Sequence, residues 1–200
     1  KVNEIAEFTK FPLVSTNVLI ESSEKKENFQ DSVSTGKKGS KTGVYEKYNN
    51  VKQGGFEPYS EIVSGDVSAC VLSVCDSTVF LSAGEKKGYT LIAPEKALSG
   101  ILPRISGKYD LIILISMLSR KENQEIARKH PEINIILEGN TGNIEKPVKF
   151  GNTIDISIDS QGGYAGILTL DISAGKTTIN EWDSVAIGDK ITDEKAQYIV

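Results

Sequence analysis

The chain has 200 residues, of which 38% are hydrophobic, and this is enough apolar material to bury the core of one sizeable domain. Its net charge of −4 gives no reason to expect nucleic-acid or anionic-membrane binding, because both require clustered positive charge. No apolar run approaches the roughly 18 residues that a membrane-spanning helix needs. The first residue is Lys1 rather than a methionine, which suggests processing or a fragment of a longer protein.

The first quarter of the chain predicts few ordered elements. Residues 1–10 are expected to end a helix, and residues 11–18 to form a short buried strand that tolerates Pro12 at its start. Residues 21–53 are rich in Lys, Glu, Ser, Gly and Asn and contain few apolar anchors. That composition predicts a surface insertion.

The middle of the chain predicts a hairpin, a helix and a buried strand. Residues 60–64 and 67–74 flank a Gly-Asp turn, which is typical of a β-hairpin. Pro94 suits the first turn of a helix, which Pro103 is expected to bend or end. The unbroken apolar run at 109–116 is typical of a parallel strand covered on both faces.

The second half predicts one strand-helix-strand unit and then a change of period. Ser119 and Glu122 have the spacing of a capping box, so a helix is expected there before Pro131, followed by a buried strand at 133–137. From Thr153 onward apolar residues alternate with polar ones. This pattern predicts successive antiparallel strands, listed by range as 153–159, 164–172 and 177–187. We therefore expect an α/β fold with α+β character, parallel strands first and antiparallel strands last, in a single domain over residues 1–200.

Few side chains have the spacing of a catalytic site. Cys70 and Cys75 are expected to be structural thiols, because their odd separation puts them on opposite faces of a strand and disfavours a disulfide. His130, the only histidine, is expected to be solvated or to cap the end of a helix. Asp76 and Asp110 lie at strand ends, and turn or surface roles are expected for both.

Three other features also have ordinary structural interpretations. The segment 139–143 lacks the Lys-Ser or Lys-Thr pair that completes a phosphate-binding loop, so a tight turn is expected. The basic run at 37–41 is short and has acidic neighbours, which favours a solvated loop. Trp182 stands alone in an alternating strand, where packing on a sheet face is the expected role.

Several segments, in order, resemble 5′-nucleotidase-type (calcineurin-like) metallophosphatases. Residues 11–18 are similar to the family passage Phe-Pro-Val-Leu-Ser-Ala-Asn-Val, and residues 56–59 to Phe-Lys-Pro-Tyr. Residues 109–119 resemble the strand that ends in Leu-Ser-His-Leu-Gly, and residues 131–142 the strand that leads into Gly-Gly-His-Thr-His. Residues 163–171 are similar to Gly-Lys-Tyr-Leu-Gly-Arg-Leu-Asp-Leu. The resemblance implies part of a four-layer α-β-β-α sandwich, of which this chain supplies roughly the C-terminal half.

The same resemblance implies that the catalytic motifs are degenerate. Family members use two metal ions, which imidazole and carboxylate groups hold. The histidine of the first motif falls on Met117, and those of the second motif fall on Asn140 and Gly142. A thioether, one amide and a glycine are poor substitutes for three imidazoles, and the remaining family ligands lie in motifs upstream of Lys1. We therefore expect no bound metal, no cofactor and no catalysis from this chain.

The resulting functional hypothesis is a pseudoenzyme that acts as a structural or protein-interaction module in a larger assembly. The alternative is a fragment or subunit of a metal-dependent phosphohydrolase whose ligands lie in a missing N-terminal part. A third possibility is a self-contained binding domain. Half a sandwich leaves an apolar sheet face uncovered, so a partner is expected, either the N-terminal portion or another subunit. Family resemblance alone suggests an extracytoplasmic (periplasmic or secreted) location.

Overall fold

The computed structural model describes residues 12–20, 57–78, 89–139, 146–157, 162–173 and 176–187. The helix end expected at 1–10 and the insertion expected at 21–53 lie outside these residues. The described elements, in chain order, are β1 (Val18–Ile20), β2 (Ser60–Ser64), β3 (Val67–Val74), β4 (Tyr89–Leu91), α4 (Pro94–Ile105), β5 (Leu111–Ser116), α5 (Arg120–Lys129), β6 (Ile135–Glu138), β7 (Val148–Phe150), β8 (Thr153–Ser157), β9 (Tyr164–Ser173) and β10 (Lys176–Ala186).

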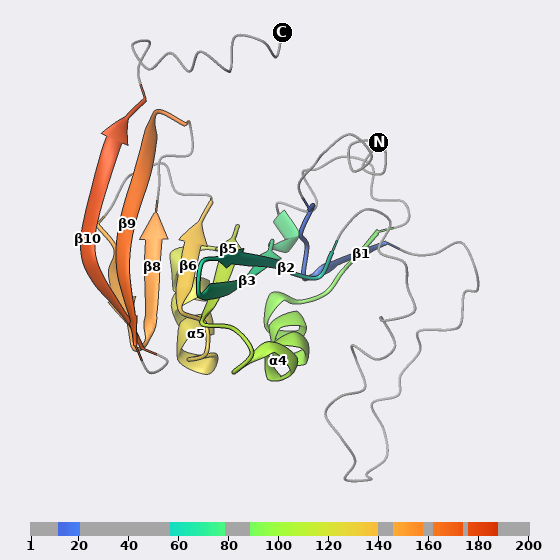
Figure 1. Ribbon diagram of the computed structural model, residues 1–200. Coiled ribbons are helices and arrows are strands. Elements are labelled where there is room, and N and C mark those ends of the chain that lie inside the picture. The colour runs from blue at the N-terminus through green and yellow to red at the C-terminus, as the bar shows by residue number, and fades with distance from the viewer. Residues whose placement is uncertain are drawn as a thin grey trace, which may run out of the picture.

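A six-stranded mixed sheet, in the order β2-β3-β5-β6-β8-β7, forms the centre of the fold (Figure 1). Strands β3, β5, β6 and β8 run parallel to one another, while β2 and β7 pair antiparallel at the two edges. Strands β9 and β10 form a separate antiparallel hairpin, and β1 pairs with β4. The predicted α/β class, with parallel strands early and an antiparallel pair last, is confirmed.

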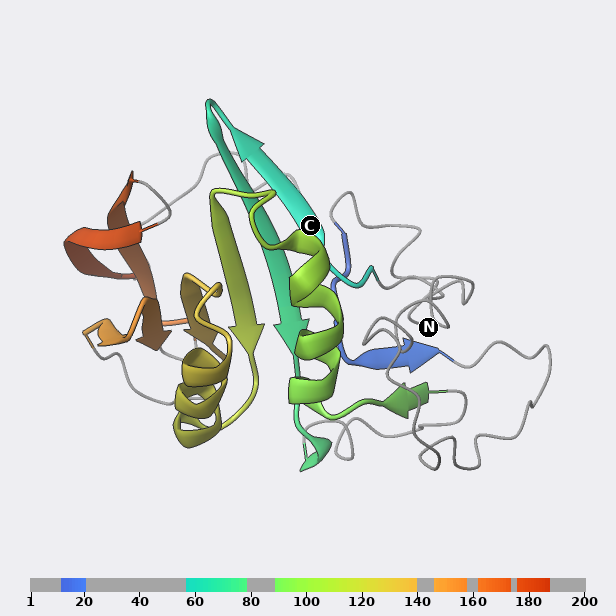
Figure 2. The same cartoon turned by 90° about the horizontal axis from the view of Figure 1, so that it is seen from below.

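The two faces of the central sheet are covered differently. Helices α4 and α5 lie on one face (Figure 2). Their apolar residues meet β3, β5 and β6 in a core that includes Leu72, Leu102 and Ile136, all fully buried. On the opposite face the β9–β10 hairpin packs on β6 and β8, with Trp182 and Leu168 against the cluster formed by Ile135, Ile154 and Ile156. The described residues therefore form three layers: helices, central sheet and hairpin. The role expected for Trp182 is confirmed.

Several local predictions are also confirmed. The hairpin β2–β3 turns at Gly65 and Asp66, and Gly65 has a φ of 59°, which a residue without a side chain adopts readily. The capping box is present at the start of α5: Ser119 Oγ accepts from the Glu122 backbone N–H, and Glu122 Oε2 accepts from the Ser119 N–H at 3.0 Å. The thiol of Cys70 is fully buried, and this burial raises its pKa to about 12.

The helix does not end at Pro103, which was one of the two effects predicted for that residue. Helix α4 continues past it to Ile105, because Pro103 stands in the last turn and removes only one helical donor there. Leu102 and Ile105 are buried against the sheet and hold this last turn in place.

The strand expected at 11–18 is also different in the structure. Val14 makes an isolated bridge to Glu57, and the regular strand begins only at Val18. Between them Thr16 and Asn17 are completely buried and use their side chains in place of a strand ladder.

The alternation that begins at Thr153 was predicted to mark three successive antiparallel strands, but only β9 and β10 pair in that way. Strand β8 lies in the central sheet between β6, to which it is parallel, and β7, to which it is antiparallel, and every one of its residues is buried. Its polar residues are buried too, and Thr153 Oγ1 donates to the Ile133 carbonyl at 2.8 Å. The alternation of apolar and polar residues in β8 therefore belongs to a strand that is covered on both faces. Strands β4 and β7, three residues each, were not predicted.

Candidate functional site

The carboxyl ends of the parallel strands meet at one edge of the central sheet, the edge where α/β proteins usually bind ligands. Met117 directly follows β5, and Gly139 directly follows β6. The Met117 N–H donates to the Val74 carbonyl at 3.0 Å, and the Gly139 N–H donates to the Ser116 carbonyl at 2.9 Å. These bonds continue the sheet past its last paired residues and fix both positions.

Met117 and Gly139 are packed against each other. A Cβ atom at Gly139 would lie 2.5 Å from Sδ of Met117, so the thioether occupies the space that a larger residue would need. Met117 is half-buried. The other two degenerate motif positions, Asn140 and Gly142, lie outside the described residues.

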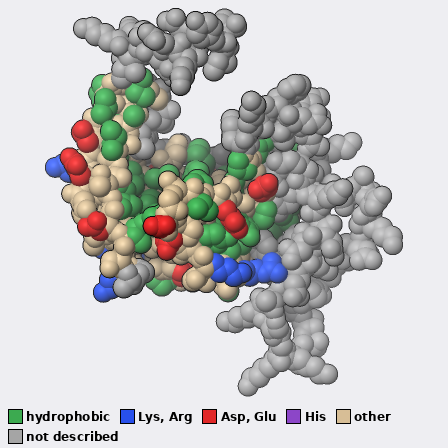
Figure 3. Space-filling model, in the orientation of Figure 1, with side chains coloured by type: hydrophobic (Ala, Val, Ile, Leu, Met, Phe, Trp, Pro, Cys, Tyr) green, Lys and Arg blue, Asp and Glu red, His purple; other side chains and the backbone are tan. Residues whose placement is uncertain are grey.

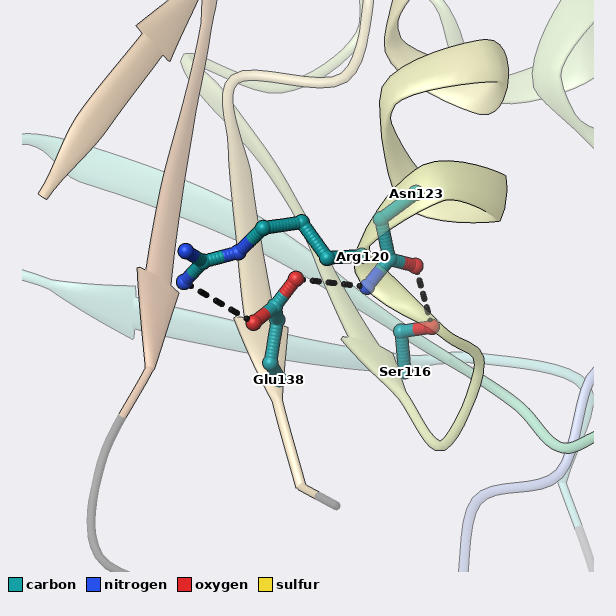
Figure 4. Close-up of polar contacts among 4 residues, drawn as sticks. All are labelled: Ser116, Arg120, Asn123 and Glu138. Carbon is teal, nitrogen blue, oxygen red and sulfur yellow. Dashed lines mark hydrogen bonds and ion pairs between the residues drawn. The ribbon is translucent and has the colours of Figure 1, made fainter. Parts of the chain in front are cut away.

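A polar network lies next to Met117, between the start of α5 and the ends of β5 and β6 (Figure 4). Ser116 Oγ donates to Asn123 Oδ1 at 2.6 Å, and Asn123 Nδ2 donates to Glu138 Oε1 at 3.1 Å. Arg120 Nη2 lies 3.3 Å from Glu138 Oε2 and forms an ion pair with it. The side chain of Glu138 is inaccessible to solvent, whereas a third of the Arg120 side chain is exposed. We call these four residues the Glu138 network.

The Glu138 network explains how α5 is held on the sheet. A buried carboxylate is stable only when it is paired and hydrogen-bonded, and both oxygens of Glu138 have partners here. Asn123 is fully buried and uses both ends of its amide. Each oxygen of the Glu138 carboxylate is therefore engaged by a side chain of α5.

A second polar cluster fixes the end of β3 beside the same edge. Asn17 Oδ1 accepts from the Cys75 N–H at 3.1 Å, and Asn17 Nδ2 donates to the Cys75 carbonyl at 2.7 Å. The same amide group donates to the Ile92 carbonyl at 3.0 Å. Asn17 therefore connects β3 to the β1–β4 pair.

The structure separates the two aspartates that the sequence places at strand ends. Asp76 lies two residues after β3 at the carboxyl edge, and it is half-buried. Asp110 precedes β5 at the opposite edge, where its Oδ2 accepts from the Ser68 N–H at 2.8 Å and from Ser68 Oγ at 2.7 Å. Both hydrogen bonds lower the pKa of Asp110, and the bond from the Ser68 backbone has the larger effect. The two carboxylates do not form one site.

His130 has one of its two expected roles. It is the C-cap residue of α5, and its backbone N–H donates to the Ile126 carbonyl at 2.8 Å. The expectation of a solvated imidazole was wrong, since His130 is only 8% exposed. Its Nδ1 lies 3.6 Å from Glu132 Oε1, and its Nε2 makes no hydrogen bond.

The Glu138 network was not predicted from the sequence, although two signals pointed to it. Asn123 stands on the apolar side of an amphipathic helix, and Glu138 ends an apolar run. A polar residue at an apolar position is the expected mark of a buried hydrogen bond. Its partner could not be found, because the pairing depends on strand register.

Comparison with known proteins places the fold. No family model matches the chain. A metallophosphoesterase from Bacillus subtilis, described as uncharacterized, is 26% identical over 97 residues, which is 48% of this chain and 21% of that protein. The NAD nucleotidase of Haemophilus influenzae superimposes with a TM-score of 0.65 at 15% identity, covering 92% of this chain and 37% of that one. A 5′-nucleotidase precursor from Thermus thermophilus gives a TM-score of 0.65 at 14% identity, covering 92% and 35% of the two chains.

This chain has the fold of the 5′-nucleotidases. The resemblance found in its sequence motifs is therefore confirmed at the level of the fold. The chain spans about a fifth of the length of the curated relative and about a third of the length of the solved structures. None of the helices in the described residues is long and apolar enough to cross a membrane.

Proposed function

We propose that this chain is a non-catalytic metallophosphatase-like module that serves a structural or protein-interaction role in a larger assembly. The observation that carries the proposal is the position of Met117. Its thioether stands at the carboxyl end of β5, where the family motif has a histidine, and packs against Gly139. A soft sulfur is a poor ligand for the hard divalent ions of such sites.

The charges near this edge also support the proposal. Glu138 is the acidic residue that ends β6, and Arg120 and Asn123 already occupy its oxygens. A carboxylate in this state holds α5 on the sheet. Within the described residues, no group of three His, Cys, Asp or Glu side chains is placed to hold a metal ion.

Under the alternative, this chain is a part of a metal-dependent phosphohydrolase. The chain covers only 21% of its curated relative and 37% of the nucleotidase structure, and this favours the alternative. In a longer protein, metal ligands outside this sequence would complete the metal site. Met117 counts against it, since upstream residues do not restore an imidazole at the end of β5.

A partner is part of the proposal. The β9–β10 hairpin covers only the β6–β8 side of the sheet, and on the same face Ile115 of β5 and Ile62 of β2 remain 38% and 53% exposed. The N-terminal portion of a longer protein or another subunit is the proposed cover. We also propose an extracytoplasmic location, for which a 5′-nucleotidase precursor among the structural neighbours is the support.

Metal content and turnover test the proposal. The chain is incubated with manganese or zinc, separated from free metal, and assayed by mass spectrometry for bound ions. The same preparation is tested on p-nitrophenyl phosphate. We expect well under one ion per chain and no hydrolysis above the buffer rate. About two ions per chain together with turnover would overturn the proposal.

The variant Met117→His is the informative comparison. Under the proposal a single imidazole at this position leaves the metal content unchanged, because one ligand does not hold a metal pair. Under the alternative, a longer form of the protein already binds metal and turns over substrate with Met117 in place, and Met117→His strengthens its metal binding. Met117→Leu is the matched control, since it changes the sulfur but keeps an apolar side chain.

A further inference from the structure

Strand β2 is the outermost strand of the central sheet, and one of its edges has no strand partner among the described residues. The hairpin has a two-residue turn, so Ser64 and Val67 exchange backbone hydrogen bonds, and so do the pairs that alternate with them. Ser60, Ile62 and Ser64 thus direct their backbone groups toward β3. The backbone N–H and C=O groups of Glu61 and Val63 face away from the sheet.

Among the described residues, β2 has few of the features that normally prevent strand addition. Proteins protect edge strands with charged side chains, lysine above all, or with proline, a bulge or a covering segment, and of these β2 carries one charged residue, Glu61. Strand β2 reads Ser-Glu-Ile-Val-Ser, and its pairing with β3 is regular from Ser60 to Ser64. Its two aliphatic side chains are exposed, Ile62 by 53% and Val63 by 74%. The hairpin also projects beyond α4 and the neighbouring strands (Figure 2), which leaves its end accessible.

The charges around β2 indicate what kind of strand it accepts. Glu61 and Asp66 are exposed on the hairpin, and Glu57 is exposed just before it. The Tyr109 hydroxyl donates a hydrogen bond to Oε1 of Glu61 and leaves its negative charge in place. Acidic and apolar side chains lie side by side on the face that carries this hairpin, with basic side chains along its lower side (Figure 3). Lys108 is an exposed base between α4 and β5, but the whole chain has a net charge of −4. A second copy of this chain would bring the same acidic groups to the contact, whereas a basic segment would neutralise them.

We infer that β2 is a docking edge for an extended segment of a partner protein in which basic residues alternate with aliphatic ones. Successive side chains of β2 point to opposite faces, so Glu61 and Val63 share one face and Ile62 lies on the other. A basic residue of the added strand lies opposite Glu61, and its aliphatic neighbour lies opposite Ile62 on the other face. Backbone hydrogen bonds to Glu61 and Val63 supply affinity, and the alternation supplies specificity.

This inference rests on the proposed interaction role and names the chemistry of the partner. The probe is a fluorescent synthetic peptide in which lysine alternates with valine, titrated with the full chain and followed by anisotropy. The matched peptide carries glutamate in place of every lysine. We expect saturable binding of the lysine peptide, at least about tenfold tighter than that of the glutamate peptide. Equal affinities would overturn the inference.

Variants of β2 place the binding on this edge. Val63→Pro removes an outward-facing N–H that β3 does not use, and it is expected to weaken binding about fivefold or more, while Val63→Thr keeps the donor and binds like the original. Ile62→Lys is expected to weaken binding similarly. Its control is Ile167→Lys on β9, where the original side chain is equally exposed at 54%. Unchanged binding by Val63→Pro, with its circular dichroism spectrum intact, would contradict the inference.

Two further readouts separate the possible failures. Sedimentation of the chain alone is expected to show no self-association through β2, and a dimer that Val63→Pro abolishes would replace the basic partner with a second copy. Metal binding with turnover would overturn the proposed function and leave the peptide result unaffected. Loss of peptide binding without metal binding would overturn only this inference.

Discussion

At the scale of single residues, the contact between Met117 and Gly139 is the feature that most separates this sheet edge from a metal site. Gly139→Ala would place a Cβ atom 2.5 Å from Met117 Sδ, so the thioether has to move. We expect a loss of about 1–2 kcal/mol of unfolding free energy, as for other overpacked sites. In a protein that also carries Met117→Ala, the new Cβ atom meets no thioether. The loss of unfolding free energy caused by Gly139→Ala should then largely disappear.

The original protein, Gly139→Ala, Met117→Ala and the double variant form a double-mutant cycle. Their free energies of unfolding in urea measure the coupling between the two positions. A Gly139→Ala cost that is the same in both backgrounds would contradict the packing described here. It would mean that the thioether does not lie over Gly139 in solution.

Asp110 provides a second prediction at this scale. Hydrogen bonds from the Ser68 backbone and hydroxyl lower its pKa below the ordinary 3.8. A depressed folded-state pKa means that the carboxylate contributes stability above the unfolded-state value, and that this contribution is lost as pH falls through the folded-state pKa. Asp110→Asn should therefore lower stability at pH 7 but not at a pH well below 3.8. Urea midpoints at both pH values test this, and an equal difference at both would count against it.

At the scale of elements, the Glu138 network fixes how α5 sits on β5 and β6, and Asn123→Asp tests it with almost no change of shape. The new carboxylate would face Glu138 Oε1 at the 3.1 Å that Asn123 Nδ2 now spans. We expect a loss of about 3 kcal/mol or more at neutral pH, as when a buried pair is broken. The loss should shrink as pH falls, because a protonated carboxyl can donate as the amide does.

Asn152→Asp is the matched control, since Asn152 is exposed in the turn between β7 and β8. It should change stability by no more than about 0.5 kcal/mol. An Asn123→Asp protein as stable as this control would show that Asn123 does not contact Glu138 in solution.

The elements also show which structural features are local enough to predict. The β2–β3 hairpin and the capping box at Ser119 depend on a few adjacent residues, and the sequence identified both. The direction of β8 depends on which strand it pairs with, and an alternating pattern is silent on that. Thr16 and Asn17 appear as ordinary polar residues, yet they are buried because β3 offers them backbone partners 57 and 58 positions away.

The candidate site also has one feature that the local sequence predicts and one that it does not. Met117 could be placed at a sheet edge, because the apolar run of β5 ends just before it. The link from Ser116 through Asn123 to Glu138 joins two strands and a helix, and it follows only from the parallel register of β5 and β6. Long-range polar pairs of this kind are set by topology, which local patterns do not specify.

At the scale of the whole molecule, the central sheet has one covered and one uncovered part on the face opposite the helices. Ile154 of β8 lies under the β9–β10 hairpin and is fully buried, whereas Ile115 of β5 is 38% exposed. The same change at both positions should therefore have unequal effects. Ile154→Thr is expected to cost about 2–3 kcal/mol, because it removes buried apolar volume and buries a hydroxyl.

Ile115→Thr is expected to cost less than about 1 kcal/mol in the chain alone, because its side chain already meets solvent there. Urea unfolding of both variants compares them directly. Equal costs would mean that another segment covers Ile115 in solution and that the sheet face needs no partner. A small cost at Ile115 that becomes large when a binding protein is added would place that protein on this part of the sheet.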